Sequence, residues 1–282
     1  MTITVTPANN VLGAFIGGIQ VADCTDDDMA VITQAYVDHG VVFFRDQELT
    51  PDEHIAFAER WSDINVNRFI PAVDTHPSIA EIRKEPDQRS NVGGEFHSDH
   101  SYDQVPAMGS ILYAREVPPA GGDTIFASQY AAYDALSDGM KATLGTMRAV
   151  HSSRHAFGVP AESYGSDQQY RNAEAATQDA LHPVIIRHPL SGRPALYVNG
   201  DFTTRFEGWR RSESRPLLQQ LFAHAAQAEF TYRFSWEVGS MAIWDNRAVQ
   251  HLAVNDYQGH RRVMHRITLE GEPIEAFVPT PG

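Results

Sequence analysis

Residues 241–269 have the sequence MAIWDNRAVQHLAVNDYQGHRRVMHRITL, and both ends of this segment are strongly apolar. The runs at 241–244 and 263–269 are short and apolar or β-branched, which predicts a buried strand at each. Upstream, the aromatic residues at 230, 232, 234 and 236 alternate with Thr, Arg and Ser. This period of two indicates a further strand with one buried face. The last third of the chain is therefore predicted to be mostly β.

The amino-terminal region adds helices to this β core. Residues 25–28 (TDDD) suit a helix N-terminus, and Gly40 suits its end. The apolar run 41–44 that follows predicts a buried strand. Residues 50–53 (TPDE) combine an N-cap, a proline at the first helical position and a capping-box glutamate, so a second helix is expected there.

The middle of the chain completes the predicted architecture. Its expected elements are strands near 110–115 and 124–127, a helix over 130–144, a hairpin over 184–198 and a helix around 215–226. Two long loops, near 65–95 and 152–180, are expected to cover a site, the first with one strand at 79–82. We predict one domain over 1–282, mostly β with flanking helices (α+β), with a jelly-roll-like barrel as its core.

Composition narrows the possible partners and compartments. The 282 residues carry 36 acidic and 22 basic side chains, a net charge of −14 that disfavours nucleic acid and anionic lipid as partners. Cys24 is the one cysteine, so no internal disulfide can form. The sequence has no basic-then-apolar start and no apolar run of about 18 residues. We therefore expect a cytoplasmic protein without a membrane span.

A candidate metal site combines His97, Asp99 and His251. In an extended backbone, positions 97 and 99 point to the same side and can share one ion. His251 follows the predicted core strand 241–244 and supplies a third ligand. Two histidines and one carboxylate on one face of an octahedron leave three positions open, which suits non-haem Fe(II). Taken alone, the His-x-Asp pair is a weak signal, because such pairs also occur as surface or capping residues.

Two arginines strengthen the metal hypothesis. Arg262 and Arg266 are four residues apart on the predicted strand, so both side chains project from one face, about 13 Å apart. If that face is the barrel interior, each buried cation requires an anion. A dicarboxylate co-substrate and an anionic substrate would supply two. The alternative is an outward-facing, solvated pair of arginines.

Several segments together resemble a known family. They are FHSD at 96–99, PAGGDT at 119–124, FTTR at 202–205, WDNRAVQH at 244–251 with Arg262 and Arg266 beyond it, and GVVFFR at 40–45. In this order and spacing the chain resembles the Fe(II)/2-oxoglutarate-dependent dioxygenases of the taurine dioxygenase and 2,4-dichlorophenoxyacetate dioxygenase family. The resemblance covers nearly the whole chain and implies a double-stranded β-helix (jelly-roll) core.

The resemblance also implies roles for individual residues. The matched positions are His97, Asp99 and His251 as iron ligands, Thr124 and Arg262 as 2-oxoglutarate-binding residues, and Arg266 as the arginine for an anionic substrate group. Family members use O₂ and 2-oxoglutarate to hydroxylate a substrate C–H, forming succinate and CO₂. Related halogenating enzymes have a small residue where this chain has Asp99, so hydroxylation is implied. Hydroxylation next to oxygen or sulfur would lead to C–O or C–S cleavage.

Expectations for the substrate also come from the resemblance. The residues expected to form an aromatic and apolar wall are Phe157 and Phe202, with Phe69, Ile70, Phe96 and Tyr102 as further candidates and Trp236 as either wall or ordinary core. The taurine enzymes have His and Tyr in the first long loop, and Asn and Trp before the His-x-Asp pair. This chain has NVNRFI at 65–70 and GGEF at 93–96 instead. We therefore expect a small anionic substrate more apolar than taurine: a sulfonate, a sulfate ester or an aryloxyalkanoate.

Two other functions stay open at the level of sequence. One is a non-catalytic sensor that binds a metal and an organic anion. The other is a zinc hydrolase that uses the same three residues with His100 as an extra ligand. A hydrolase needs no arginine for 2-oxoglutarate, so the arginine pair favours the oxygenase. Because family members commonly self-associate, we also expect a homo-oligomer.

Overall fold

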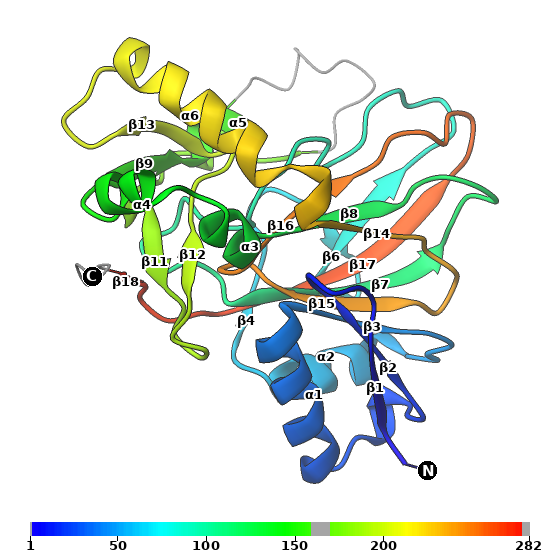
Figure 1. Ribbon diagram of the computed structural model, residues 1–282. Coiled ribbons are helices and arrows are strands. Elements are labelled where there is room, and N and C mark those ends of the chain that lie inside the picture. Colours follow the sequence, from blue (N-terminus) through cyan, green and yellow to red (C-terminus); the bar gives the residue numbers. More distant parts are fainter. Residues whose placement is uncertain (1, 159–169, 278–282) are drawn as a thin grey trace.

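The computed structural model describes residues 2–158 and 170–277, and its largest element is a nine-stranded sheet (Figure 1). The strand order is β1-β2-β3-β15-β7-β17-β6-β5, and β4 pairs with β17. The strands are β1 Thr4–Pro7, β2 Ala14–Gly17, β3 Val41–Phe44, β4 Ile64–Asn65, β5 Ala72–Val73, β6 His76–Lys84, β7 Gly109–Glu116, β15 Met241–Asp245 and β17 Arg262–Leu269. All neighbours pair antiparallel except β2 and β3, which are parallel.

A three-stranded sheet packs against the inner face of the large one. Its order is β14-β8-β16, with β14 at Thr231–Phe234, β8 at Thr124–Ser128 and β16 at Val249–Ala253. The core between the sheets joins Phe43 and Trp244 of the large sheet to Phe126 and Phe234 of the small one. Phe43 and Phe234 stack with ring centroids 4.3 Å apart. Two facing antiparallel sheets with helices outside confirm the predicted α+β class and jelly-roll core.

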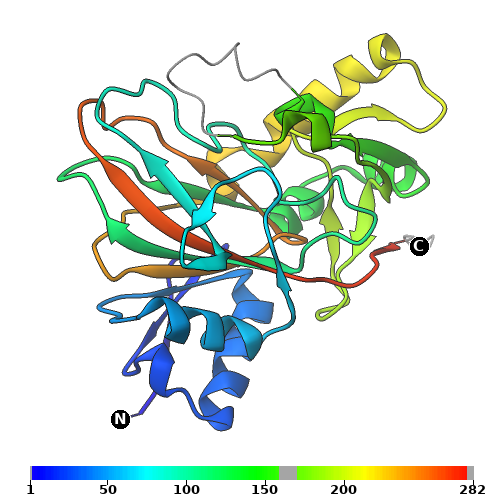
Figure 2. The same cartoon turned by 180° about the vertical axis from the view of Figure 1, so that it is seen from behind.

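Two helices cover the outer face of the large sheet (Figure 2). They are α1 (Asp26–His39) and α2 (Pro51–Glu59). Both begin with a capping box, at Thr25 and at Thr50, and the sequence predicted the one at Thr50. Gly40 ends α1 with φ 73°, a left-handed conformation that glycine adopts without strain. The buried side chains of these helices pack on outward-facing residues of β3, β7, β15 and β17.

A second layer of small elements lies beyond the three-stranded sheet. It holds two further three-stranded sheets, β10-β9-β13 and β12-β11-β18, and the helices α3 to α6. The bounds are α3 Gln129–Asp134, α4 Asp138–Leu144, β9 Arg148–Ser152, α5 Ser153–Phe157, β10 Asp179–Pro183, β11 Ile185–Arg187, β12 Pro194–Leu196, β13 Thr203–Phe206, α6 Arg211–Ala225 and β18 Glu275–Ala276. Short 3-10 turns occur at Val21–Asp23, Ala173–Ala175 and Ala228–Phe230.

Three expectations about local structure are wrong. The helix over 130–144 is two helices, because Ser137 is extended and its hydroxyl caps a new helix at Met140 N. The strand in the first long loop is the nine-residue β6, which pairs with β17 from Arg262↔Lys84 to Arg266↔Ala80. His251 lies within a strand of its own, β16, which the sequence did not predict. Residues 159–169 of the second long loop lie outside the described part of the chain.

No helix within residues 2–158 and 170–277 is long and apolar enough to cross a membrane.

Candidate metal centre

Three buried side chains converge near the inner surface of the large sheet. His97, Asp99 and His251 each offer one ligand atom, and these atoms lie within 4.8 Å of one another. Nε2 of His97 is 3.6 Å from Oδ1 of Asp99, and Nε2 of His251 is 3.9 Å from Oδ2 of the same carboxylate. Two imidazole nitrogens and one carboxylate oxygen thus surround one point, at distances that one metal ion can span.

Backbone pairing brings these residues together across a long sequence separation. His97 and His251 form an antiparallel bridge, with N···O distances of 3.1 and 2.9 Å. The same strand β16 pairs with β8 on its other side, where His251 opposes Phe126. Position 97 is therefore extended, and Asp99 reaches the same side as His97 before the chain turns at His100 (φ 57°).

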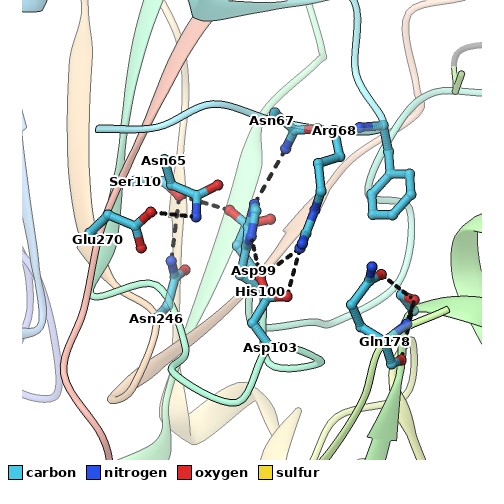
Figure 3. Close-up of polar contacts among 12 residues, drawn as sticks. Asn65, Asn67, Arg68, Asp99, His100, Asp103, Ser110, Gln178, Asn246 and Glu270 are labelled. Atoms are coloured by element: carbon cyan, nitrogen blue, oxygen red, sulfur yellow. Dashed lines mark hydrogen bonds and ion pairs between the residues drawn. The ribbon is translucent and has the colours of Figure 1, made fainter. Parts of the chain in front are cut away.

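Hydrogen bonds fix the orientation of two of the ligands. Nδ1 of His97 lies 2.8 Å from the carbonyl oxygen of Glu95, which can only accept, so Nδ1 carries the proton and Nε2 is left for a metal. Ser110 Oγ donates to Asp99 Oδ2 at 2.9 Å, and Asn246 Nδ2 donates to Ser110 Oγ at 3.5 Å (Figure 3). Sequence reasoning assigned no role to Ser110 or Asn246, although Asn246 lies in the quoted segment WDNR.

The charges at the site suit a metal cation. Burial alone would raise the pKa of Asp99, but Arg266 and the two histidines lower it well below its ordinary value. Burial and the neighbouring His97 lower the pKa of His251 well below its usual range, so this imidazole is neutral at physiological pH. For His97, burial is outweighed by Asp99 and Asp201, which raise its pKa. An ionised carboxylate and a neutral imidazole are the forms that bind metal, so Asp99 and His251 are in the metal-binding form, whereas a metal at His97 has to displace the proton that its raised pKa favours.

Arg266 lies directly against the candidate metal ligands. Its Nη1 donates to both oxygens of Asp99, at 3.0 and 3.2 Å, and the side chain is buried. Its Nε has no hydrogen-bond partner among the described residues. Arg266 lines the same cavity as His97 and Asp99. The sequence left an interior and an outward-facing position open, and the structure places Arg266 in the interior, with Asp99 as one anion for this arginine.

Arg262 occupies a different corner, together with Thr124. Its guanidinium is buried, and Nε and Nη2 lack a partner among the described residues. Thr124 Oγ1 accepts a hydrogen bond from Trp236 Nε1 at 2.9 Å, and the Trp236 ring centroid is 5.9 Å from the Arg262 guanidinium carbon. Burial lowers the pKa of Arg262. Trp236 packs in the core between the sheets. Of the two roles considered for it, substrate wall or ordinary core residue, this packing matches the second.

Aromatic side chains form one wall of the cavity beside the ligands. Phe69 stacks on Phe157 with centroids 4.3 Å apart, and Tyr102 meets Phe202 edge-on at 4.9 Å. The described lining of the cavity comprises Ile70, Val92, Gly93, His97, Asp99, Ala156, Phe157, Tyr170, Asp201, Phe202 and Arg266. Tyr102 stands behind Phe157 and Phe202. Phe96 is half-buried and lies outside the described lining.

His100 is held by residues other than the three ligands, with Asn67 on one side of its ring and Asp103 on the other (Figure 3). Its Nδ1 lies 3.0 Å from Asp103 Oδ2, and its Nε2 lies 3.4 Å from Asn67 Nδ2. Both ring nitrogens are thus engaged by the loop around Asn67 and by the turn after Asp99. This arrangement disfavours the zinc site with His100 as an extra ligand.

Comparison with known proteins gives a consistent assignment. Residues 4–268 match the model of the family described as Taurine catabolism dioxygenase TauD, TfdA family. The alpha-ketoglutarate-dependent sulfate ester dioxygenase of Pseudomonas putida is 32% identical over 277 residues, which cover 96% of this chain and 91% of that protein. The (S)-phenoxypropionate/alpha-ketoglutarate-dioxygenase of Sphingobium herbicidovorans is 30% identical over 278 residues, which cover 95% of each chain.

A solved structure supports the same family assignment. The crystal structure of AAD-2 in complex with Mn(II) and N-oxalylglycine has a TM-score of 0.81 at 28% identity, and the match covers 97% of this chain and 99% of that one. The likeness therefore holds for the sequence and the architecture over nearly the full length. This chain belongs to the taurine catabolism dioxygenase TauD, TfdA family, and is an alpha-ketoglutarate-dependent (2-oxoglutarate-dependent) dioxygenase by that membership.

Proposed function

We propose that this enzyme binds Fe(II) at His97, Asp99 and His251 and hydroxylates a C–H bond of a small anionic organic substrate. The observation that carries the proposal is the convergence of these three side chains beside a cavity lined by Arg266. Three protein ligands leave room on an octahedral ion for a chelating co-substrate and O₂. When bound, the iron supplies the activation of O₂, coupled to oxidation of 2-oxoglutarate to succinate and CO₂.

The chain's own residues would hold 2-oxoglutarate from its far end. Arg262 retains two buried donor nitrogens without a described partner, and a buried cation in this state is stabilised by an anion. Thr124 lies in the same corner, where its hydroxyl is oriented by Trp236. We assign the distal carboxylate of 2-oxoglutarate to Arg262 and Thr124. This position leaves the 2-oxo acid end of the molecule for the metal.

The cavity favours a substrate with an anionic head and an apolar body. Arg266 supplies positive charge, while Phe157 and Phe202, backed by Tyr102, supply the aromatic side. Sulfate esters, sulfonates and aryloxyalkanoates fit this description, and the two relatives named above are dioxygenases of a sulfate ester and of phenoxypropionate. Hydroxylation of the carbon attached to oxygen or sulfur would then release the fragment by C–O or C–S cleavage.

The region around Asn67 disfavours taurine. The Asn67 Oδ1 accepts hydrogen bonds from the backbone nitrogens of Phe69 and Ile70, at 2.9 and 2.8 Å, and its Nδ2 faces His100. The side chain therefore shapes its own loop. Asn67 therefore has no polar atom left for a substrate amine.

The whole chain, 1–282, is proposed to form one dioxygenase domain whose two long loops, near 65–95 and 152–180, cover the active site. The single stretch matched by the family model supports one domain. Ile70 and Val92 of the first loop and Ala156 and Phe157 of the second line the cavity beside the ligands. Self-association and a cytoplasmic location remain predictions from the sequence.

A substrate panel tests this function. Purified enzyme with Fe(II) and 2-oxoglutarate would be given alkyl sulfates, alkyl- and arylsulfonates, aryloxyalkanoates and taurine, with succinate formation and O₂ uptake measured together. We expect one of the first three classes to stimulate both signals in equal amounts, and taurine to stimulate neither. If no class stimulates succinate formation, or if taurine is the best substrate, the proposal is wrong.

A further inference from the structure

Asp103 lies where three segments of the chain meet, beside the aromatic wall of the cavity. Its backbone nitrogen donates to His100 O at 3.0 Å, which closes the turn after the first two metal-ligand candidates. Its carboxylate accepts from Arg68 Nη2 at 2.6 and 2.8 Å and lies 3.0 Å from His100 Nδ1 (Figure 3). His182 Nε2, on β10, lies 2.9 Å from its backbone oxygen. The metal-binding turn, the first long loop and β10 are thus joined at this residue.

The ion pair with Arg68 is more than an isolated surface contact. The side chains of Arg68 and Asp103 are 38% and 17% exposed, and the same carboxylate also faces an imidazole. Isolated exposed pairs contribute little to stability, whereas partly buried pairs within a network contribute more. The Arg68 guanidinium carbon also lies 5.7 Å from the ring centroids of Phe69 and of Tyr102. The pair therefore fixes the first long loop against the turn that carries the metal-ligand candidates.

The second long loop docks on the backbone of the same two residues of the first. Arg171 N donates to Phe69 O at 2.8 Å, and Asn172 Nδ2 donates to Arg68 O at 2.8 Å. Phe157, at the other end of the second loop, stacks on Phe69 with ring centroids 4.3 Å apart. The position of the second loop, and of the cavity residue Phe157, therefore depends on where the first loop is held.

We propose that Arg68 and Asp103 are positioning residues for the substrate. Their ion pair holds the first loop where the second loop docks, and so fixes the aromatic wall to which Phe157 belongs. This inference rests on the proposed function, because it assigns that wall to the substrate. Neither residue belongs to the described lining of the cavity, so their effect reaches the substrate through the two loops. The co-substrate corner at Arg262 makes no described contact with the pair, and binding of 2-oxoglutarate should not depend on it.

Hydrogen–deuterium exchange tests the docking of the loops without any ligand. In Arg68→Met we expect the amides of residues 67–72 and of residues 170–178 to exchange about 3- to 10-fold faster than in the wild type, because local opening becomes easier. The matched control is Arg60→Met, since Arg60 also pairs with an aspartate, Asp26 at 2.5 Å, but at the ends of α2 and α1. Both segments should exchange at the wild-type rate in this control. Wild-type exchange of residues 170–178 in Arg68→Met would overturn the inference.

Isothermal titration calorimetry tests the consequence for the substrate. The Kd values of hexyl sulfate, hexanesulfonate and phenoxyacetate would be measured on the enzyme loaded with Mn(II) and 2-oxoglutarate. We expect Arg68→Met and Asp103→Asn each to raise the Kd of the tightest of these probes about 3- to 10-fold. The double variant should lose no more than the weaker-binding single variant, because the two residues act through one contact. Arg68→Lys keeps the charge and should recover part of the affinity.

The outcomes separate a positioning role from a merely structural one. The Kd of 2-oxoglutarate, measured separately, should equal that of the wild type in every variant, and an equal loss for 2-oxoglutarate would overturn the inference. Independent losses that add up in the double variant would overturn it too. If Asp103→Asn does not fold, the exchange rates of Arg68→Met and Arg68→Lys decide, with the lysine variant expected closer to the wild type. A wild type that binds none of the three probes would refute the proposed substrate classes, while the exchange experiment would still decide the docking of the loops.

Discussion

β15 and β16, which follow each other in the chain but belong to different sheets, carry two buried polar clusters of similar composition, one at the turn that joins them and one on β16. At the turn, Asp245 Oδ1 accepts from Arg247 Nε at 2.8 Å, and Oδ2 accepts from Arg247 Nη2 at 2.7 Å and from His188 Nε2 at 2.9 Å. Arg247 and His188 lower the pKa of Asp245 far below its ordinary value, against the effect of burial. This cluster satisfies its charges internally.

The cluster around His251 uses the same residue types but leaves polar atoms unsatisfied. His251 Nδ1 and Arg262 Nε and Nη2 are buried without a hydrogen-bond partner among the described residues. Unsatisfied buried polar groups cost stability, so their presence requires a reason. The comparison shows that burial and residue type do not distinguish a structural cluster from a binding cluster. Between these two clusters, the difference is the number of polar atoms left without a described partner beside the cavity.

The largest effect is expected from His251→Ala. Loss of one of the three ligands should lower turnover by about 10³-fold or more, because the metal supplies the oxidation chemistry. Substrate-stimulated succinate formation and metal content after Fe(II) loading would be measured. The melting temperature would be measured beside them, because the buried His251 ring packs against Trp244 and Phe126 and its truncation leaves a cavity. A variant that retains a tenth of the wild-type rate would contradict the assignment.

Arg247→Met should instead affect the fold. The change removes the guanidinium that donates to both oxygens of the buried Asp245 carboxylate, which costs about 3–5 kcal/mol in the free energy of unfolding. Urea denaturation followed by circular dichroism would measure it. The control is Arg193→Met, because Arg193 is largely exposed and its nearest carboxylate, on Asp134, is 4.0 Å away. Equal stability of Arg247→Met and wild type would remove the contrast between the two clusters.

Arg262→Met should change the free energy of unfolding in the opposite direction to Arg247→Met. Without 2-oxoglutarate, replacing a buried cation that lacks described partners should leave stability unchanged or raise it by about 1 kcal/mol. The Kd of 2-oxoglutarate should rise about 100-fold, the loss of a charged, bidentate contact. Both quantities are accessible by denaturation and calorimetry on one preparation. Strong destabilisation with unchanged affinity for 2-oxoglutarate would show that Arg262 has a structural role, like that of Arg247.

Ser110→Ala tests the hydrogen bonds that support the metal ligands, and its expected effect on affinity is smaller. Ser110 holds Asp99 Oδ2 in place, and loss of such a support lowers metal affinity about 10-fold. Competition with a chelator would measure Fe(II) affinity, with Ser62→Ala as the exposed control. Identical metal affinity in both variants would mean that Arg266 alone orients Asp99.

His54 is an unsatisfied buried residue on α2, away from the ligands. Burial, His265 and Arg115 lower its pKa from 6.5 to about 3. Between these values only the unfolded chain takes up the proton, so the stability contribution present above pH 6.5 is lost as the pH falls, by up to about 1.4 kcal/mol per pH unit.

Denaturation at pH 7, 6, 5 and 4 would therefore show a shallower loss of stability in His54→Leu than in the wild type. Parallel curves for the two proteins would contradict the assignment. A shallower loss in His54→Leu would show that an unsatisfied nitrogen far from the metal ligands causes acid sensitivity and no ligand binding. This would separate it from the unsatisfied atoms of the cluster around His251.

The sequence predicted features that local chemistry determines. The helix start at residues 25–28, the helix end at Gly40 and the capping box at Thr50 depend on residues within one turn, and the structure has all three. The three candidate metal ligands could also be proposed from the sequence. The alternation of side chains along an extended chain and the ligand types that a metal prefers are both local rules. The alternation over 230–236 likewise produced β14.

Features that depend on the partner strand could not be predicted from the chain alone. Lys84 faces Arg262 only because β6 extends to residue 84 and pairs in one register with β17. Ser110 reaches Asp99 from β7, and Arg266 meets Asp99 from β17, 167 residues away. Such contacts follow from tertiary packing, which the periodicity of a single sequence does not reveal.

The central claim is that His97, Asp99 and His251 bind one Fe(II) ion that still has room for 2-oxoglutarate. Adding 2-oxoglutarate to the anaerobic Fe(II)-loaded enzyme and recording the visible spectrum tests it most directly. We expect a weak, broad charge-transfer band in the wild type that is absent in His251→Ala. A wild-type spectrum without this band, as a zinc hydrolase or a site filled by protein ligands would give, would contradict the account.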